Sequence, residues 1–127
     1  MYIEHLKDIN LLGKTIIGID GMSRYSEKIT ITFNDGSILI MNSPDTYSNV
    51  SVEDVCGDLE DLIGSPLQRA EEVNNLNMPA KDAYTTSFTW TFYKFATEKG
   101  YVDIRWYGTS NGYYSEKCSL DYIDNGV

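Results

Sequence analysis

The sequence is poor in the residues on which most catalytic and metal sites depend. Its 127 residues include one histidine, His5, and two cysteines, Cys56 and Cys118. We find no serine or cysteine nucleophile motif, no glycine-rich phosphate loop and no spacing typical of metal ligands. The sequence therefore predicts a protein that is not an enzyme and has no cofactor and no metal site. Carboxylate pairs that form only in the fold remain an alternative source of acid–base chemistry.

Long apolar runs and a signal sequence are also absent. No segment approaches 18 consecutive apolar residues, and Glu4 and Asp8 interrupt the N-terminal segment where a signal peptide is apolar. Two cysteines do not by themselves indicate a disulfide framework. We therefore expect a cytoplasmic protein that does not associate with membranes.

Basic residues are few relative to acidic ones. Ten Lys and Arg stand against 19 Asp and Glu, which gives a net charge of −9. Broad affinity for nucleic acid depends on clustered Lys and Arg, so we expect no direct binding of duplex DNA. The negative charge favours either plain solubility or attraction of a basic protein that normally binds nucleic acid.

The residues that are abundant suit a β protein. Hydrophobic residues make up 42% of the chain, as in ordinary globular domains, and the length predicts a single domain over 1–127. Ten tyrosines supply flat amphipathic surface, which suits either sheets or recognition surfaces.

The segment 28–42 predicts a β-hairpin. Apolar residues alternate with polar ones on both sides of Asp35-Gly36, a typical two-residue hairpin turn. This turn pairs Asn34 with Ser37. In that register one face carries five apolar side chains, Ile29, Ile31, Phe33, Ile38 and Ile40.

Other segments complete a mainly β (α+β) fold. We predict strands at 14–20 and 67–73, a long polar loop at 74–87, and short helices within 1–13 and at 59–63. Asp58 is the expected N-cap of the second helix. The expected architecture is an antiparallel sheet of hairpins and a C-terminal meander with one or two short helices.

The C-terminal third carries the clearest alternation. It predicts three meander strands, with Trp90 and Trp106 on core faces. We expect Ser110-Asn111-Gly112 to form a three-residue hairpin loop with Gly112 at positive φ. That register gives a core face of Val102, Ile104, Trp106, Cys118, Leu120 and Tyr122.

The same register places Arg105 opposite Lys117 on the polar face. Together with Tyr107 and Tyr113 they form a candidate ligand site for a small anionic nucleotide. Arginine donates two parallel hydrogen bonds to a phosphate, and tyrosine offers a ring on which a base stacks. The alternative is that Asp103 and Asp121 only neutralise the two cations.

Three stretches carry a resemblance to a known group of proteins. RWYGTSNGYYS, SFTWTFYKFATEKGYVDI and GDLEDLIGSPLQRAEEV resemble a family of small uncharacterised proteins encoded by bacteriophages and prophages. The likeness covers about residues 54–120. It implies no catalytic residue, but it implies a setting, because small accessory phage proteins often interfere with host defence inside the bacterial cell.

Two functions fit that setting. The first is a sponge that sequesters a small nucleotide signal at Arg105, Tyr107, Tyr113 and Lys117, with a homo-oligomer interface as one arrangement of the site. The second is an acidic decoy that imitates nucleic acid and inhibits a basic host defence protein such as a CRISPR nuclease. An enzyme that degrades such a signal is a third alternative.

Overall fold

Two antiparallel β-sheets make up most of the protein. The computed structural model describes residues 1–44, 47–74 and 77–124, and this part of the chain contains nine β-strands and two 3-10 helices. In chain order they are β1 Tyr2–Ile3, η1 Leu6–Asp8, β2 Ile16–Asp20, β3 Lys28–Phe33, β4 Ile38–Asn42, β5 Asn49–Gly57, η2 Leu59–Leu62, β6 Arg69–Asn74, β7 Ser87–Thr97, β8 Gly100–Ser110 and β9 Ser119–Ile123. The predicted mainly β fold with antiparallel pairing is confirmed.

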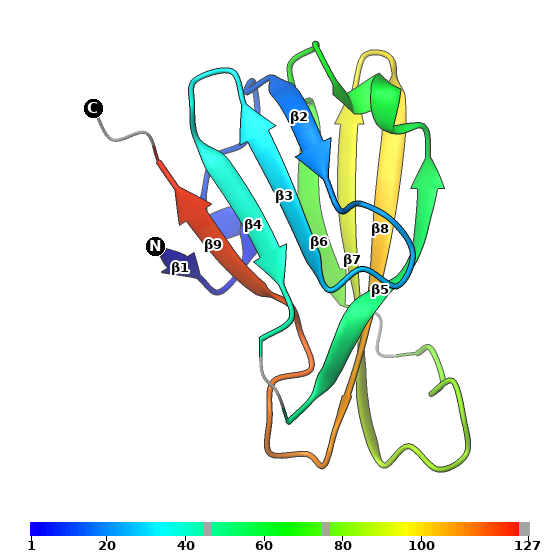
Figure 1. Cartoon of the computed structure of the whole chain (residues 1–127). Helices are drawn as coiled ribbons and strands as arrows, with labels where there is room; N and C mark the ends of the chain where they lie inside the picture. Colours follow the sequence, from blue (N-terminus) through cyan, green and yellow to red (C-terminus); the bar gives the residue numbers. More distant parts are fainter. Residues whose placement is uncertain (45–46, 75–76, 125–127) are drawn as a thin grey trace.

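The two sheets face each other across one hydrophobic core (Figure 1). One sheet has the strand order β1-β9-β4-β3-β2 and the other β5-β8-β7-β6. Trp106 and Tyr93 are the largest fully buried side chains, and both point inward from the four-stranded sheet. Burial of each large apolar side chain contributes about 1.5–3 kcal/mol, so this shared core is the main source of stability.

The β3–β4 hairpin has a different turn from the predicted one. Phe33 pairs with Ser37 through the Phe33 amide, so the loop has three residues and ends at Gly36, whose φ is +87°. Asp35 accepts hydrogen bonds from the amide and hydroxyl of Ser37, which stabilises this longer loop. The register therefore shifts by one residue, and Leu39 and Met41 enter the core in place of the predicted Ile38 and Ile40.

The two tryptophans lie on opposite faces of the four-stranded sheet. Trp106 is in the core, as predicted. Trp90 is only 6% exposed, but it lies on the outer face, where it is covered by the loop 77–86. The prediction of a core face for Trp90 was wrong, because alternation identifies residues that share a face without telling which face meets the other sheet.

The predicted pairing of the last two strands was also wrong. β8 pairs with β5 and β7, while β9 pairs with β4 and β1 in the other sheet. Arg105 therefore faces Asp54 and Phe92 instead of Lys117. The six side chains expected on the core face are all buried, because the inner faces of both sheets meet in one core. Gly112 has φ +96°, as predicted, although its turn does not join a hairpin.

The short helices are single 3-10 turns. Asp58 caps η2 by accepting a hydrogen bond from the amide of Glu60, as predicted. The segment 1–13 holds a two-residue strand and η1 instead of a full helix, because its backbone bonds go partly to β9. Within the described ranges, no helix has the length and apolar character needed to cross a membrane.

The connection between β8 and β9 crosses from one sheet to the other over Gly108. A Cβ atom at this position would lie 1.8 Å from the backbone oxygen of Glu116, so only glycine allows this approach. The Glu116 carboxylate accepts hydrogen bonds from Thr89 and Ser110. Burial by itself would raise the pKa of the Glu116 carboxyl. The hydrogen bonds from hydroxyl groups have the larger combined effect, so the pKa lies below its usual value.

Replacement of this glycine tests the crossing. We expect Gly108→Ala to lower the free energy of unfolding by about 1–3 kcal/mol, because the methyl group forces the crossing segment away from β8. Gly18→Ala is the matched control, since its Cβ would meet only Thr32 at an ordinary 3.9 Å. Urea unfolding of both variants measures the difference. Equal stability of the two variants would contradict the close approach at Gly108.

The two cysteines give a second test of the core. Cys118 is buried and lies 3.2 Å from the Tyr93 hydroxyl, whereas Cys56 is exposed. Burial raises the pKa of the Cys118 thiol to about 12, so almost no reactive thiolate is present at about pH 8. We expect a disulfide reagent to label one thiol per native chain and both after unfolding. Cys56→Ser should abolish labelling of the native protein, and rapid labelling that persists in this variant would show that Cys118 is accessible.

Candidate functional site

The four residues predicted to bind a ligand do not form one site. Arg105 and Tyr107 lie on the outer face of the four-stranded sheet. Tyr113 lies in the segment between β8 and β9 and is 89% exposed. Lys117 contacts Glu72, whose side chain lies on the inner face of β6. Arg105 and Lys117 are therefore separated by the sheet itself.

Arg105 lies against aromatic side chains. Its guanidinium carbon is 5.6 Å from the centre of the Trp90 ring, and one terminal nitrogen is 3.6 Å from the carboxylate of Asp54. The Nε atom is buried and has no hydrogen-bond partner within the described part of the chain. The Tyr107 ring is 4.4 Å from the Trp90 ring, so an arginine and two aromatic rings do lie together here.

The loop 77–86 covers this aromatic group. The Trp90 indole donates to the carbonyl of Pro79 at 2.9 Å, and the amide of Lys81 donates to the Tyr107 hydroxyl at 3.1 Å. The Lys81 ammonium also pairs with Glu53 at 2.6 Å. The polar atoms of Trp90 and Tyr107 therefore hold the loop in place.

The predicted partners of the two cations were wrong. Asp103 lies 3.7 Å from Lys94, and Asp121 pairs with the N-terminal ammonium at 2.8 Å. Both expected pairings depended on β8 and β9 being neighbours. In the structure Asp54 is the ion-pair partner of Arg105, and Glu72 is the ion-pair partner of Lys117.

A buried carboxylate organises the edge of the sandwich at β6. The Glu72 side chain is 7% exposed and accepts from His5 Nδ1 at 2.8 Å, Lys117 Nζ at 3.0 Å and the amide of Leu6 at 3.1 Å. Tyr93 lies beside it, and burial, together with Cys118 and Glu72, raises the pKa of the Tyr93 hydroxyl. Several charged hydrogen bonds to one carboxylate hold the N-terminal segment against β6 and the end of the crossing segment.

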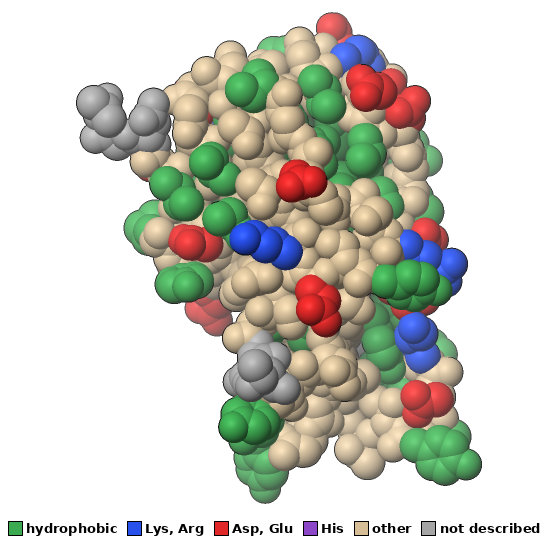
Figure 2. Space-filling model, viewed as in Figure 1, with side chains coloured by type: hydrophobic (Ala, Val, Ile, Leu, Met, Phe, Trp, Pro, Cys, Tyr) green, Lys and Arg blue, Asp and Glu red, His purple; other side chains and the backbone are tan. Residues whose placement is uncertain are grey.

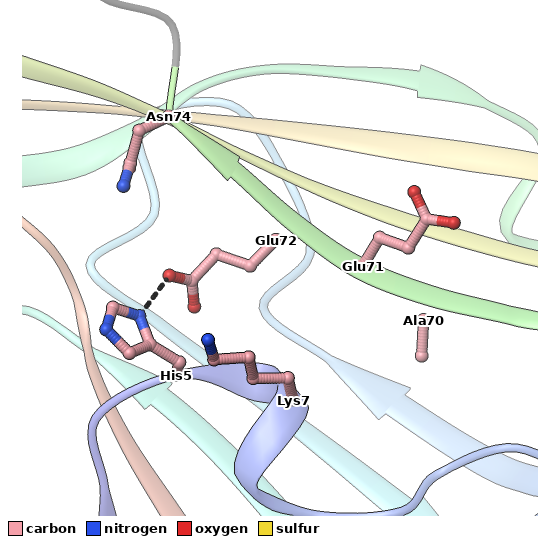
Figure 3. Close-up of a pocket in the computed structure, with 6 residues that line it drawn as sticks. All are labelled: His5, Lys7, Ala70, Glu71, Glu72 and Asn74. Carbon is pink, nitrogen blue, oxygen red and sulfur yellow. Dashed lines mark hydrogen bonds and ion pairs between the residues drawn. The ribbon is translucent and has the colours of Figure 1, made fainter.

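A cavity of about 340 Å³ opens beside Glu72. Figure 3 shows the six side chains that line it, with His5 and Lys7 from the N-terminal segment facing those from β6. They are His5, Lys7, Ala70, Glu71, Glu72 and Asn74. Sequence patterns carry little sign of this cavity, because His5 and Glu72 are 67 positions apart. Alternation places Ala70 and Glu72 on one face of β6, but it does not show what covers that face.

A second candidate site lies at one end of the sandwich, where three connections meet (Figure 1). We call this surface the tyrosine-rich end and define it by Tyr47, Tyr84, Tyr113 and Tyr114. Tyr47 stacks on Tyr114 with ring centres 5.1 Å apart. A cavity of about 300 Å³ opens here, lined by Tyr47, Asn49, Tyr84, Thr85, Thr86, Thr109, Ser110 and Asn111.

The composition of the tyrosine-rich end is that of a recognition surface. Figure 2 shows side chains of the hydrophobic class, which includes tyrosine, at the lower end of the molecule. Tyrosine supplies rigid contact area, and Ser, Thr and Asn supply adaptable hydrogen bonds. None of the described residues that line its cavity is basic, so this end is not built for a phosphate.

The described residues offer no metal centre. Among them, no group of three or more His, Cys, Asp or Glu side chains is arranged to hold a metal ion. The acidic group at 53–61 instead makes local contacts, such as the cap of η2 by Asp58 and the pairing of Glu53 with Lys81. The candidate sites are therefore an aromatic group under a loop, a polar cavity beside Glu72, and the tyrosine-rich end.

Comparison with known proteins gives one match. The model of a family described as a domain of unknown function, DUF7448, matches residues 9–120. Searches of curated proteins and of solved structures found no match. The matched region contains the tyrosine-rich end, Arg105 and Lys117, whereas His5 and Lys7 precede it. The chain therefore belongs to the DUF7448 family of domains of unknown function.

Proposed function

We propose that this protein is a binding protein, encoded by a phage or prophage, that inhibits a basic host defence protein by contacting it through the tyrosine-rich end. The observation that carries the proposal is the convergence of four tyrosines from three connections at one end of a rigid sandwich. Loops on a rigid β scaffold are a common place for binding residues.

The exposure of these tyrosines supports recognition of a macromolecule. Tyr84 and Tyr113 are 92% and 89% exposed, although burial of an aromatic side chain is favourable. In protein interfaces tyrosine is enriched among the residues that contribute most binding energy. A partner surface that covers both rings would gain this burial, at a small cost in side-chain entropy.

The charge of the chain favours a basic partner. A net charge of −9 attracts a positively charged surface over several ångströms and raises the rate of encounter. On the face seen in Figure 2, Lys and Arg side chains are scattered among acidic ones and form no basic patch. The proposed partner is therefore a protein whose exposed groove normally binds nucleic acid.

Tyrosine substitutions test this proposal. We expect Tyr84→Ala combined with Tyr113→Ala to weaken binding of the host partner by about 30-fold or more, as for loss of an interface hot spot. The partner is first captured from defence-active cells with wild-type protein and identified by mass spectrometry, and its affinity is then measured with purified components.

Tyr101→Ala is the matched control, because Tyr101 is 63% exposed and is the second residue of β8, at the other end of that strand from the tyrosine-rich end. It should bind the partner like the wild type. Affinity should also fall steeply with salt. Full affinity of the double variant would refute the role of the tyrosine-rich end.

Sequestration of a small nucleotide is the second candidate function. The observation that favours it is the Arg105 guanidinium beside Trp90 and Tyr107, with the buried Nε lacking a partner among the described residues. A base between aromatic rings and a phosphate on the guanidinium would use both features. Such a ligand would have to displace the loop 77–86, whose contacts with this group include two hydrogen bonds and a ring contact from Lys81.

Arg105→Ala tests the nucleotide hypothesis. If the guanidinium binds phosphate, the variant should stay folded but lose the thermal stabilisation that a panel of nucleotides gives to the wild type, since such a bond contributes about 1.5–3 kcal/mol. Lys94→Ala is the control, because Lys94 is a cation on the same strand pair that pairs with Asp103. Equal nucleotide responses of wild type and Arg105→Ala would exclude this site.

A further inference from the structure

The cavity between η1 and β6 is lined by three side chains with nitrogen atoms, Lys7, Asn74 and His5, and by the carboxylates of Glu71 and Glu72. We propose that it is a binding site for a small molecule that carries a phosphate or carboxylate group, with Lys7, Asn74 and His5 around the anion. Nothing in this proposal depends on the tyrosine-rich end or on Arg105, which lie elsewhere on the molecule.

The charges that line the cavity leave one cation over. Glu72 pairs with Lys117 at 3.0 Å, and Glu71 pairs with Arg69 at 2.9 Å. Lys7 also lines the cavity and has no ion-pair or hydrogen-bond partner in the part of the chain that the structure describes. In Figure 3 its ammonium group points into the space between η1 and β6. Lys7 is therefore the lining cation without a partner among the described residues, while Glu4 and Asp8 also contact His5.

Asn74 is oriented as a donor. Its side-chain oxygen accepts a hydrogen bond from the Thr91 hydroxyl at 3.2 Å, which fixes the amide so that its nitrogen is left to face the cavity. Figure 3 shows this nitrogen on the side toward His5. An amide NH₂ group and an ammonium group across one cavity are suited to the oxygens of one oxyanion.

His5 completes the set because Glu72 orients its ring. Nδ1 is bound to the Glu72 carboxylate at 2.8 Å, which leaves Nε2 on the other side of the imidazole, 3.8 Å from Glu4. A carboxylate on one nitrogen favours the tautomer that donates there and fixes the orientation of the ring. The His5 ring therefore lies beside the anion in an orientation that Glu72 sets.

The size of the cavity limits the ligand. A volume of about 340 Å³ lies at the lower end of the range for small-molecule sites, about 300–1,000 Å³. Inorganic phosphate alone would leave most of that space unfilled. The expected ligand is a small metabolite with one anionic group, since none of the described residues that line the cavity is a Phe, Tyr or Trp on which a base would stack.

Binding of three probes tests the site. Inorganic phosphate, ribose 5-phosphate and acetate are titrated to about 10 mM into the full chain while amide and side-chain NMR signals are recorded. We expect the NMR signals of Asn74 and of the His5 ring to shift and to saturate as a probe is added. Comparison of the affinities of the two phosphates with that of acetate will show which anion is preferred. Absence of saturable shifts at these residues for all three probes would overturn the proposal.

Lys7→Met and Lys28→Met form the matched pair of variants. Lys28 is an exposed lysine on β3, away from the cavity. We expect Lys7→Met to weaken probe binding by at least about tenfold, as for loss of a charged hydrogen bond, and Lys28→Met to leave it unchanged. An equal effect of the two substitutions would mean that only net charge matters and would overturn the site.

A second pair of variants separates this site from the proposed functions. Asn74→Asp adds a like charge beside the anion and should abolish binding, while the hydrogen bond from Thr91 is kept. Arg105→Ala and the Tyr84/Tyr113 double variant should bind the probes like the wild type. Loss of probe binding in Arg105→Ala would place the anion on the outer sheet face and contradict this proposal.

Discussion

The crossing of the chain from β8 to β9 is the constraint on which the candidate sites depend. Both edges of β8 are occupied, by β5 and β7, so the chain after Ser110 has to leave that sheet to find a free edge. It passes over Gly108 and joins the other sheet between β1 and β4. The crossing places Tyr114 against Tyr47, and it carries Lys117 to Glu72. The tyrosine-rich end and the cavity at β6 thus both depend on this crossing of the chain from one sheet to the other.

Glu72 is the second organising element. A carboxylate that is almost fully buried is costly unless its oxygens are satisfied, and here donors come from the N-terminal segment, from the crossing segment and from the core tyrosine. These contacts join parts of the chain that are distant in sequence. They also provide Glu72 with its partners, while the neighbouring Lys7 has no partner among the described residues.

The candidate surfaces differ in chemistry, which separates the functions they support. The cavity at the tyrosine-rich end is lined by uncharged side chains, as expected for contact with another protein, whereas the cavity at β6 is lined by charged and polar side chains. Arg105, Trp90 and Tyr107 form a third group that the loop 77–86 covers. Membership of the DUF7448 family assigns no chemistry to any of them. The physical argument for binding therefore rests on exposure, charge and hydrogen-bond geometry.

Local patterns in the sequence were enough to predict most of the strands, though not β1 and β5, together with the cap of η2, the positive φ of Gly112 and the six buried side chains of the C-terminal third. Alternation reports which residues share a face, so it identified these without any knowledge of strand partners. It did not predict that β9 joins β4, that Trp90 faces outward, or that the hairpin turn at Asp35 has three residues. The contact of His5 with Glu72 was also out of reach. Strand pairing and ion pairs between distant segments depend on which sheet edges and faces remain free once the core has formed. Local patterns in a single sequence do not show which edges and faces these are.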